Sequence, residues 1–299
     1  MGPGARIGVA ALSGPVDPEK LDRGLEELRR LGFEPVPADN LRSRHGLFAG
    51  GDAERLDAFH RLAADPDLPA ILFARGGYGL MRVLPGIDWD LLRRHPRAYV
   101  GYSDLTPFLL EVVRRLGLVA FHGPLVAAEM ARGLTPAEEE SFLGALAGRY
   151  PAEQPFTRWL RGGGQEVRGT LLGGCLSLLV ATLGTPYAAD LDGALVFWED
   201  VAEPQYRVDR MLTHLGLSGN LANIAGMVVG HLEGGEEPDG EPVDWPALVT
   251  DGLARFSWPL AWGLESGHAT PNLTLPLGLP ARLRADGRLV LGDDRSANP

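Results

Sequence analysis

The fold of this chain is decided by the stretch Arg97-Ala-Tyr-Val-Gly-Tyr-Ser103-Asp104-Leu-Thr-Pro-Phe-Leu-Leu-Glu-Val-Val-Arg-Arg-Leu-Gly117, in which a short β-prone run meets an apolar-periodic helix. Ser103 stands at the junction. A side chain on a sharp strand-to-helix turn is exposed, and the amides that follow it point where a helix N-terminus stabilises negative charge. A serine nucleophile and its oxyanion need this arrangement. The match to G-x-S-x-G is incomplete, because Leu105 replaces the second glycine, so a second interpretation makes Ser103 or Asp104 a helix N-cap.

Strands and helices alternate on both sides of this junction. Strands are predicted at residues 7–12, 33–36, 68–74, 98–102 and 118–121, and helices at 18–31, 52–63, 105–116 and 136–146. This order predicts a Rossmann-like parallel sheet with helices on both faces. Sites in such sheets lie beyond the carboxyl ends of the strands. Both Arg75-Gly76-Gly77 and the Ser103 junction fall there.

The length of 299 residues favours two domains. Residues 1–150 are expected to form the N-terminal domain. Residues 151–165 are rich in Pro and Gly and lack periodicity, so they are interpreted as a linker. Residues 166–299 are expected to form a smaller, mixed α/β domain, with strands near 166–171, 194–198, 224–229 and 273–276 and a terminal hairpin that turns at Asp286-Gly287.

Composition excludes several classes of protein. The net charge is −11, Lys20 is the only lysine, and no basic block appears, so we expect no nucleic-acid partner. Cys175 is the single cysteine, which excludes an internal disulfide. No apolar run approaches the roughly 20 residues that span a bilayer, and the N-terminal apolar run is too short for a signal peptide. We expect a cytoplasmic protein that does not bind membranes.

Other segments carry polar groups that chemistry could use. Arg75-Gly76-Gly77-Tyr78-Gly79 fits neither G-x-G-x-x-G nor a P-loop, and it is either a tight turn or a source of a backbone amide for a neighbouring site. Glu199 and Asp200 end an apolar strand, where a carboxylate could orient a histidine or bind a cation. A solvated pair at a strand end is the alternative. His268 lies in a loop, and His122 and His231 compete with it as a catalytic base. No metal-ligand motif is found, so we expect neither a metal nor a cofactor.

A resemblance to a known family rests on motifs along nearly the whole chain. The first half contains Ser13-Gly-Pro, Ala74-Arg-Gly-Gly-Tyr-Gly79, Leu84-Pro, Val100-Gly-Tyr-Ser-Asp-Leu-Thr106 and His122-Gly-Pro124. The second half contains Gly173-Gly-Cys-Leu-Ser-Leu-Leu179, Gly184-Thr-Pro-Tyr187, Trp198-Glu-Asp-Val201, Tyr206-Arg-Val-Asp-Arg-Met-Leu212 and Gly267-His with Asn272-Leu-Thr-Leu-Pro-Leu-Gly278. In this order, they resemble the LD-carboxypeptidase family, which includes the microcin-C immunity peptidases.

The resemblance implies a Ser-Glu-His triad whose members come from both domains. By motif, Ser103 would be the nucleophile, His268 the base and Glu199 the acid that orients the histidine. The amides of Gly76 and Asp104 would form the oxyanion hole, with Gly77 as the alternative to Gly76. The family usually has asparagine after the double glycine, where this chain has Cys175.

The implied activity is release of the terminal D-alanine from murein tetrapeptides, by hydrolysis of its amide with an L-centre (diaminopimelate or lysine), during cell-wall recycling. A microcin-C-like peptidase that cleaves an aspartyl-nucleotide conjugate is the alternative, and Trp159 and Trp198 would then be candidates to stack on the base. A non-catalytic module that binds a small ligand is the alternative from another class. A carboxypeptidase must recognise a free carboxylate, and Arg75 is the candidate for this role, although a structural salt bridge would also explain it. The resemblance also implies a homodimer.

Overall fold

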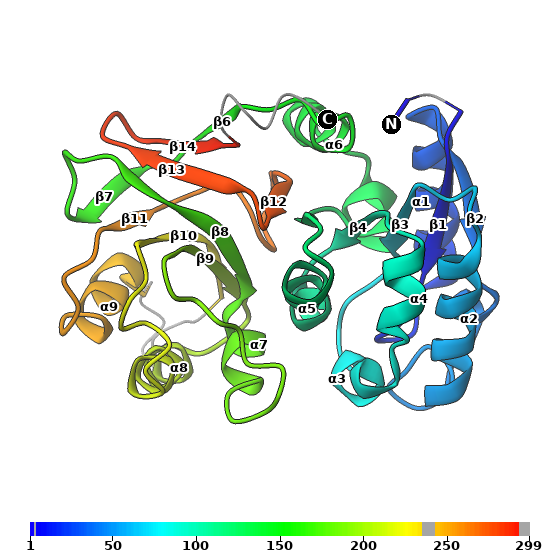
Figure 1. Cartoon of the computed structure of the whole chain (residues 1–299), viewed down its shortest axis with the longest axis horizontal. Helices are drawn as coiled ribbons and strands as arrows, with labels where there is room; N and C mark the ends of the chain where they lie inside the picture. The colour runs from blue at the N-terminus through cyan, green and yellow to red at the C-terminus, as the bar shows by residue number, and fades with distance from the viewer. Residues whose placement is uncertain (3, 235–242, 293–299) are drawn as a thin grey trace. The chain divides into compact units, whose positions relative to one another are not determined.

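The computed structural model describes residues 1–2, 4–234 and 243–292 (Figure 1). The chain divides into two compact units. Unit 1 comprises Met1–Gly148 and Leu273–Pro276, and unit 2 comprises Arg149–Asn272 and the described chain from Leu277 onward. Each unit is built around one β-sheet.

The sheet of unit 1 has the strand order β12-β5-β4-β3-β1-β2. The strands are β1 (Arg6–Ala10), β2 (Glu34–Pro37), β3 (Ala70–Phe73), β4 (Ala98–Gly101), β5 (Ala120–His122) and β12 (Leu275–Leu277). Strands β1 to β5 pair in parallel, and β1 lies between β2 and β3. The strand order therefore reverses at β1 and β3. Ligand sites of doubly wound sheets lie beyond the carboxyl ends of the strands at such a point.

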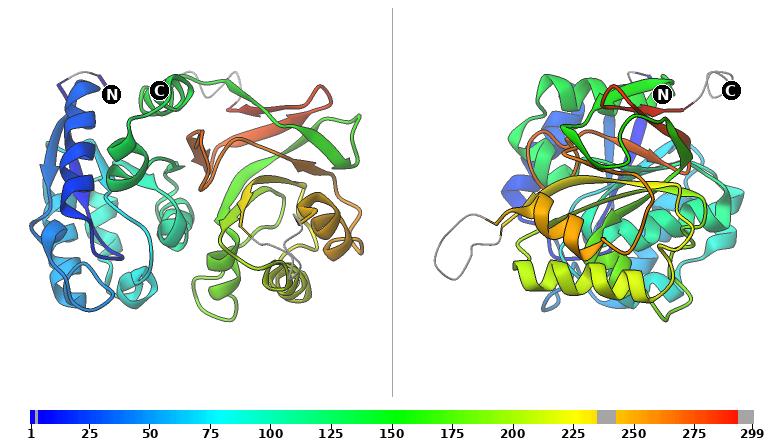
Figure 2. Two further views of the ribbon diagram at one scale, coloured as in Figure 1. Left: turned by 180° about the vertical axis from the view of Figure 1, so that it is seen from behind. Right: turned by 90° about the vertical axis from the view of Figure 1, so that its left-hand side faces the viewer.

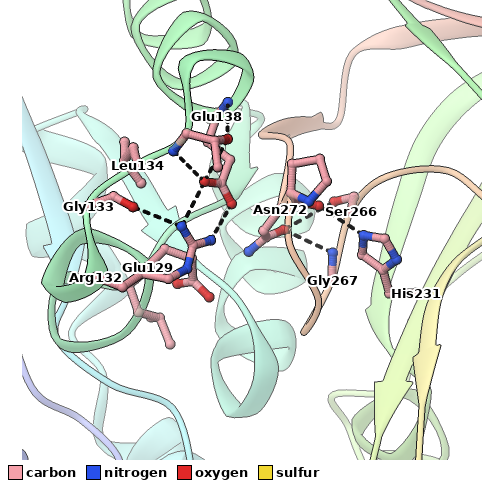
Figure 3. Close-up of polar contacts among 12 residues, drawn as sticks. Glu129, Arg132, Gly133, Leu134, Glu138, His231, Ser266, Gly267 and Asn272 are labelled. Atoms are coloured by element: carbon pink, nitrogen blue, oxygen red, sulfur yellow. Dashed lines mark hydrogen bonds and ion pairs between the residues drawn. The ribbon is translucent and has the colours of Figure 1, made fainter.

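All four residues of β3 are buried, as expected in a parallel sheet that has helices on both faces. The helices are α1 (Pro18–Arg30), α2 (Asp52–Ala64), α3 (Leu80–Val83), α4 (Trp89–Arg94), α5 (Thr106–Leu116) and α6 (Pro136–Leu146). Asp17 caps α1, which begins with proline, and Thr135 with Glu138 forms a capping box at the start of α6. Glu138 also pairs with Arg132 (Figure 3). The predicted doubly wound α/β fold is confirmed.

The sheet of unit 2 has the order β6-β14-β13-β8-β9-β10-β11-β7. Its strands are β6 (Ala152–Pro155), β7 (Arg158–Arg161), β8 (Val167–Cys175), β9 (Ala194–Val201), β10 (Gly226–Glu233), β11 (Leu260–Trp262), β13 (Pro280–Arg284) and β14 (Arg288–Leu291). Strands β8 to β11 are parallel and the outer pairs are antiparallel, which confirms a mixed sheet. The predicted terminal hairpin is present as β13 and β14.

Three helices accompany this second sheet: α7 (Leu176–Ala181), α8 (Gln205–Leu217) and α9 (Trp245–Gly252). Helix α8 contacts both α7 and α9, and the three lie on the same side of the sheet (Figure 2). Val208, Leu212 and Leu215 form the buried face of α8.

The segment 151–165, expected to be a linker, contains two strands of the second sheet. Strand β6 pairs with β14, and β7 pairs with β11, both antiparallel. Each strand has only four residues, and Pro and Gly flank them, so no period-2 pattern is long enough to be seen in the sequence. A second difference concerns 273–276, which were assigned to the C-terminal domain. They belong to unit 1, where β12 extends the parallel sheet next to β5.

Within the described ranges, no helix is both long and apolar enough to cross a bilayer.

Candidate active site

Ser103 occupies a strained turn between β4 and α5. Its φ is 62°, which places a non-glycine residue in the left-handed region. Residues 103–105 form a single 3₁₀ turn, and the Thr106 hydroxyl donates to the Ser103 carbonyl over 2.8 Å before α5 begins. Strain of this kind costs about 1–2 kcal/mol and persists where the surroundings impose it. A nucleophile at a strand-to-helix turn is held in this way.

The glycine loop after β3 comes very close to this serine. A β-carbon built on Gly76 would lie 2.9 Å from Ser103 Cβ, 3.1 Å from Ser103 Oγ and 3.3 Å from the Asp104 nitrogen. Any side chain at Gly76 would therefore displace Ser103. Gly77 has a different requirement, because its φ is 92° while a side chain there would meet only Arg75, at 3.7 Å. The backbone of Gly76, rather than that of Gly77, thus lies against the hydroxyl.

The side chain of Asp104 holds the end of the glycine loop that follows β3. Its Oδ2 accepts the backbone N–H of Leu80 over 2.8 Å, and only 3% of the residue is exposed. Burial raises the pKa of the Asp104 carboxyl, while the hydrogen bond from Leu80 acts in the opposite direction. The Gly14 amide also donates to the Gly76 carbonyl over 3.1 Å, which joins the loops after β1 and β3. Gly76 therefore lies at the point where the strand order reverses, and Ser103, which follows the neighbouring strand β4, lies against it.

Glu199 and His268 form a hydrogen-bonded pair in unit 2, in which the glutamate is buried and the histidine partly exposed. Glu199 is on β9, is fully buried, and its Oε2 lies 2.6 Å from His268 Nδ1. Desolvation raises the pKa of the Glu199 carboxyl, although His268 favours its ionised form. The position next to the histidine must be glycine, because a β-carbon on Gly267, whose φ is 123°, would lie 2.7 Å from Glu199 Oε2. This contact shows why glycine precedes His268 in the sequence.

Polar contacts hold both ends of the loop that carries His268 (Figure 3). The side-chain oxygen of Asn272 accepts the Gly267 N–H over 2.9 Å, and Asn272 is fully buried. His231, on β10, lies 2.9 Å through Nε2 from the Pro271 carbonyl. Sequence reasoning considered His231 as a base and assigned no role to Asn272. The burial of Asn272 is what indicates its role in holding the loop, and this burial cannot be seen in the sequence.

The remaining candidates lie as follows. His122 is buried at the end of β5, with its ring 5.2 Å from that of Tyr102. Arg75 is exposed, and its Nη1 donates to the Pro15 carbonyl. The salt bridges among the described residues do not include Arg75. Within the described residues, no three His, Cys, Asp or Glu side chains are grouped as a metal site would require.

Comparisons with known proteins match both halves of the chain. The model of the LD-carboxypeptidase N-terminal domain matches residues 7–123, and that of the LD-carboxypeptidase C-terminal domain matches residues 168–283. This chain belongs to the LD-carboxypeptidase family. It is therefore a serine peptidase, and so a hydrolase.

Three similar proteins span nearly the full chain. A Bacillus subtilis (strain 168) protein named probable murein peptide carboxypeptidase is 35% identical over 286 residues, 94% of this chain and 89% of the relative. The crystal structure of muramoyltetrapeptide carboxypeptidase from Oxalobacter formigenes aligns with a TM-score of 0.86 and 31% identity, covering 96% of this chain and 99% of that one. The microcin C7 self-immunity protein MccF of Escherichia coli is 26% identical over 298 residues, 90% and 86% of the two chains.

Cys175, at the position where the family usually has asparagine, lies beside Glu199. It is 3% exposed, is the register partner of Glu199 across β8 and β9, and its Sγ lies 3.2 Å from Ser177 Oγ. Burial, together with the charges of Glu199 and Asp200, raises the pKa of the Cys175 thiol well above its ordinary value. The thiol is therefore a neutral neighbour of the Glu199 carboxylate.

Proposed function

We propose that this chain is a serine LD-carboxypeptidase that releases terminal D-alanine from murein tetrapeptides, with Ser103 as nucleophile, His268 as base and Glu199 as the residue that orients the base. The observation that carries the proposal is the turn at Ser103, where a positive φ and the close approach of Gly76 surround one hydroxyl. An N-cap role for Ser103 would explain neither feature. The pair of Glu199 and His268 supports the same assignment.

The chemistry follows from the atoms available. With Nδ1–H bonded to Glu199, the neutral ring carries its lone pair on Nε2, the atom that accepts the serine proton in a triad. Ser103 Oγ attacks the amide carbon, and the amides of Gly76 and Asp104 stabilise the resulting oxyanion. His268 then protonates the departing D-alanine nitrogen, which breaks the C–N bond and leaves an ester on Ser103. Water, deprotonated by His268, hydrolyses that ester.

The substrate assignment rests on the family and on the names of two relatives, the murein peptide and muramoyltetrapeptide carboxypeptidases. We propose an L-centre of diaminopimelate or lysine before the D-alanine, a role in cell-wall recycling in the cytoplasm, and a homodimeric assembly. Light scattering at micromolar concentration measures the last of these directly.

The microcin-like alternative would need an exposed aromatic ring to stack on a nucleobase. Trp198 is fully buried in β9, with its indole nitrogen 3.1 Å from Met227 sulfur, and Trp159 packs edge-on against Phe156 at 5.1 Å. Neither favours a nucleotide conjugate over a murein peptide.

The decisive experiment compares turnover of L-Ala-D-Glu-diaminopimelate-D-Ala with that of an aspartyl adenylate, in wild type and Ser103→Ala. We expect D-alanine release by the wild type only. Cleavage of the adenylate alone would establish the microcin-like alternative. Binding of the tetrapeptide without cleavage, equal in both proteins, would establish a non-catalytic ligand-binding module.

A further inference from the structure

Arg55 is a fully buried arginine that the chemistry proposed above does not use. It lies on α2, and its side chain has no exposed surface. Its Nη1 donates to the carbonyls of Leu12 and Gly79, the second over 3.0 Å. Its Nη2 donates to Asp52 over 2.7 Å, and its guanidinium lies 4.8 Å from the centre of the Phe48 ring.

The two carbonyls belong to the two loops at the reversal of strand order. Leu12 follows β1, and Gly79 ends the glycine loop that follows β3. A guanidinium can reach both because it carries several donors in one plane, whereas a lysine ammonium is a single point. Burying a charge costs free energy unless hydrogen bonds satisfy it. The printed partners of Arg55 within the described residues are two backbone carbonyls and one carboxylate, which suits it to holding those groups in place.

One peptide group shows how this geometry reaches Ser103. The peptide between Gly79 and Leu80 has its C=O bound by Arg55 and its N–H bound by the Asp104 carboxylate. Asp104 directly follows Ser103 in the chain. The far end of the loop that carries Gly76 is therefore clamped between a buried cation and the side chain of the residue next to the nucleophile.

We propose that Arg55 is a positioning residue for the oxyanion site: by holding the Leu12 and Gly79 carbonyls, it fixes the glycine loop so that the Gly76 amide stands at a set distance from the Asp104 amide. This proposal rests on the proposed function. A shift of about 1 Å in such a donor is enough to cost about 10²-fold in rate. Loss of this positioning should lower kcat rather than raise KM, because the oxyanion forms only in the transition state.

The chain provides a matched control in Arg82. This arginine also bonds Asp52, over 3.0 Å, and also lies over Phe48, at 5.0 Å, but its side chain is 54% exposed. Its side chain donates to no loop carbonyl within the described residues. Comparison of Arg55→Met with Arg82→Met thus isolates the contacts with Leu12 and Gly79 from those with Asp52 and Phe48.

The first measurement is steady-state hydrolysis of the tetrapeptide at a temperature where each variant is folded by circular dichroism. For Arg55→Met we expect kcat to fall about 10²-fold with KM changed less than about threefold, and for Arg82→Met both constants near wild type. Arg55→Lys should recover part of kcat, because the ammonium can still bond one carbonyl. Equal kcat in Arg55→Met and Arg82→Met, or a change confined to KM, would overturn the proposal.

The second measurement is hydrogen exchange of the backbone amides of residues 76–80, which needs neither substrate nor activity. We expect faster exchange in Arg55→Met, or in Arg55→Lys if the methionine variant does not fold, and wild-type exchange in Arg82→Met. Unchanged exchange in the Arg55 variant overturns the positioning role. If the wild type hydrolyses no tetrapeptide, the proposed function fails, while this exchange experiment still decides whether Arg55 holds the loop.

Discussion

Gly76 and Ser103 approach so closely that a β-carbon on the glycine would lie 2.9 Å from the β-carbon of the serine. Real β-carbons do not approach other atoms to this distance, so the contact restricts position 76 to glycine for lack of space. At position 77 the restriction is conformational, since φ is 92° and the surroundings are open to 3.7 Å. Positions 76 and 77 therefore require glycine for different physical reasons, and substitution at each position distinguishes the two.

Gly76→Ala should lower kcat/KM on the order of 10²-fold, because the methyl group displaces either Ser103 or the Gly76 amide. Gly77→Ala should instead reduce the free energy of unfolding by about 1–2 kcal/mol, from the left-handed backbone, and leave more of the activity. Kinetics and urea unfolding of both variants make the comparison. An active Gly76→Ala beside an inactive Gly77→Ala would transfer the oxyanion role to Gly77.

Ser103→Ala and Ser103→Gly should both lose at least about 10³-fold in kcat, since the nucleophile is gone. They should differ in stability. The φ of 62° strains alanine but not glycine. Ser103→Gly should therefore unfold at a higher urea concentration than Ser103→Ala, with a free energy of unfolding larger by about 1 kcal/mol. Near wild-type turnover in either variant would remove Ser103 from the mechanism, and equal stability would contradict the strained turn.

Much of this arrangement can be predicted from the sequence, because it depends on local patterns. The strand–serine–helix junction at Ser103 and the alternation of strands and helices each show in a few consecutive residues. Strands β6 and β7 cannot be seen in this way, since four residues between prolines and glycines give no periodic signal. The membership of β12 in the first sheet depends on a pairing with β5 about 150 residues away in sequence.

The supporting residues are hidden from the sequence for a related reason. Arg55 is in line with the apolar residues of α2, but the sequence does not show which groups it bonds. Asn272 lies in a loop, where asparagine is common. Burial and specific backbone partners give each its role, and those of Arg55 come from distant segments: Arg55 reaches Gly79, 24 residues on. A single sequence reveals the reactive side chain more readily than the groups that hold it in place.

Glu199→Gln should lower kcat, less severely than Ser103→Ala, and should become more stable relative to wild type as pH rises. Burial raises the pKa of Glu199 in the folded chain above its ordinary value of 4.5. Between these two pKa values, the unfolded chain releases a proton that the folded chain retains, so wild-type stability falls as pH increases through this window. Glutamine does not titrate. Urea unfolding from pH 4 to 8 tests this. A free energy of unfolding of Glu199→Gln that falls relative to that of wild type as pH rises would contradict it.

Cys175 should resist alkylation in the folded protein. Its thiol is buried and its pKa is raised well above the ordinary value, so the thiolate that reacts with iodoacetamide is scarce at pH 8. Because it is the only cysteine, intact-mass analysis gives one adduct or none. We expect none in the native protein and complete alkylation in guanidinium. Native alkylation within minutes would contradict the burial beside Glu199.

The last prediction concerns how the substrate's terminal carboxylate is recognised. Arg75 directly precedes Gly76 and its side chain is exposed. Within the described residues its side chain donates one hydrogen bond, to the Pro15 carbonyl, and a guanidinium carries further donors that can bind a ligand. Arginine holds a carboxylate bidentately, and loss of such a charge-assisted pair costs roughly 2 kcal/mol or more, about 30-fold in kcat/KM. We therefore expect amidation of the tetrapeptide C-terminus to lower wild-type kcat/KM by at least about this factor.

The assignment to Arg75 itself is tested by repeating the comparison in Arg75→Gln and Arg75→Lys. If Arg75 binds the carboxylate, Arg75→Gln should cleave the free acid and the amide at similar rates, because neither can then form the pair. Arg75→Lys keeps the charge and a donor for Pro15 but loses the planar fork, so its preference for the acid should be intermediate. If the ratio of the cleavage rates of acid and amide is the same in wild type and Arg75→Gln, another residue binds the carboxylate. Equal cleavage of acid and amide by the wild type would show that the enzyme does not act as a carboxypeptidase, which would favour the microcin-like alternative.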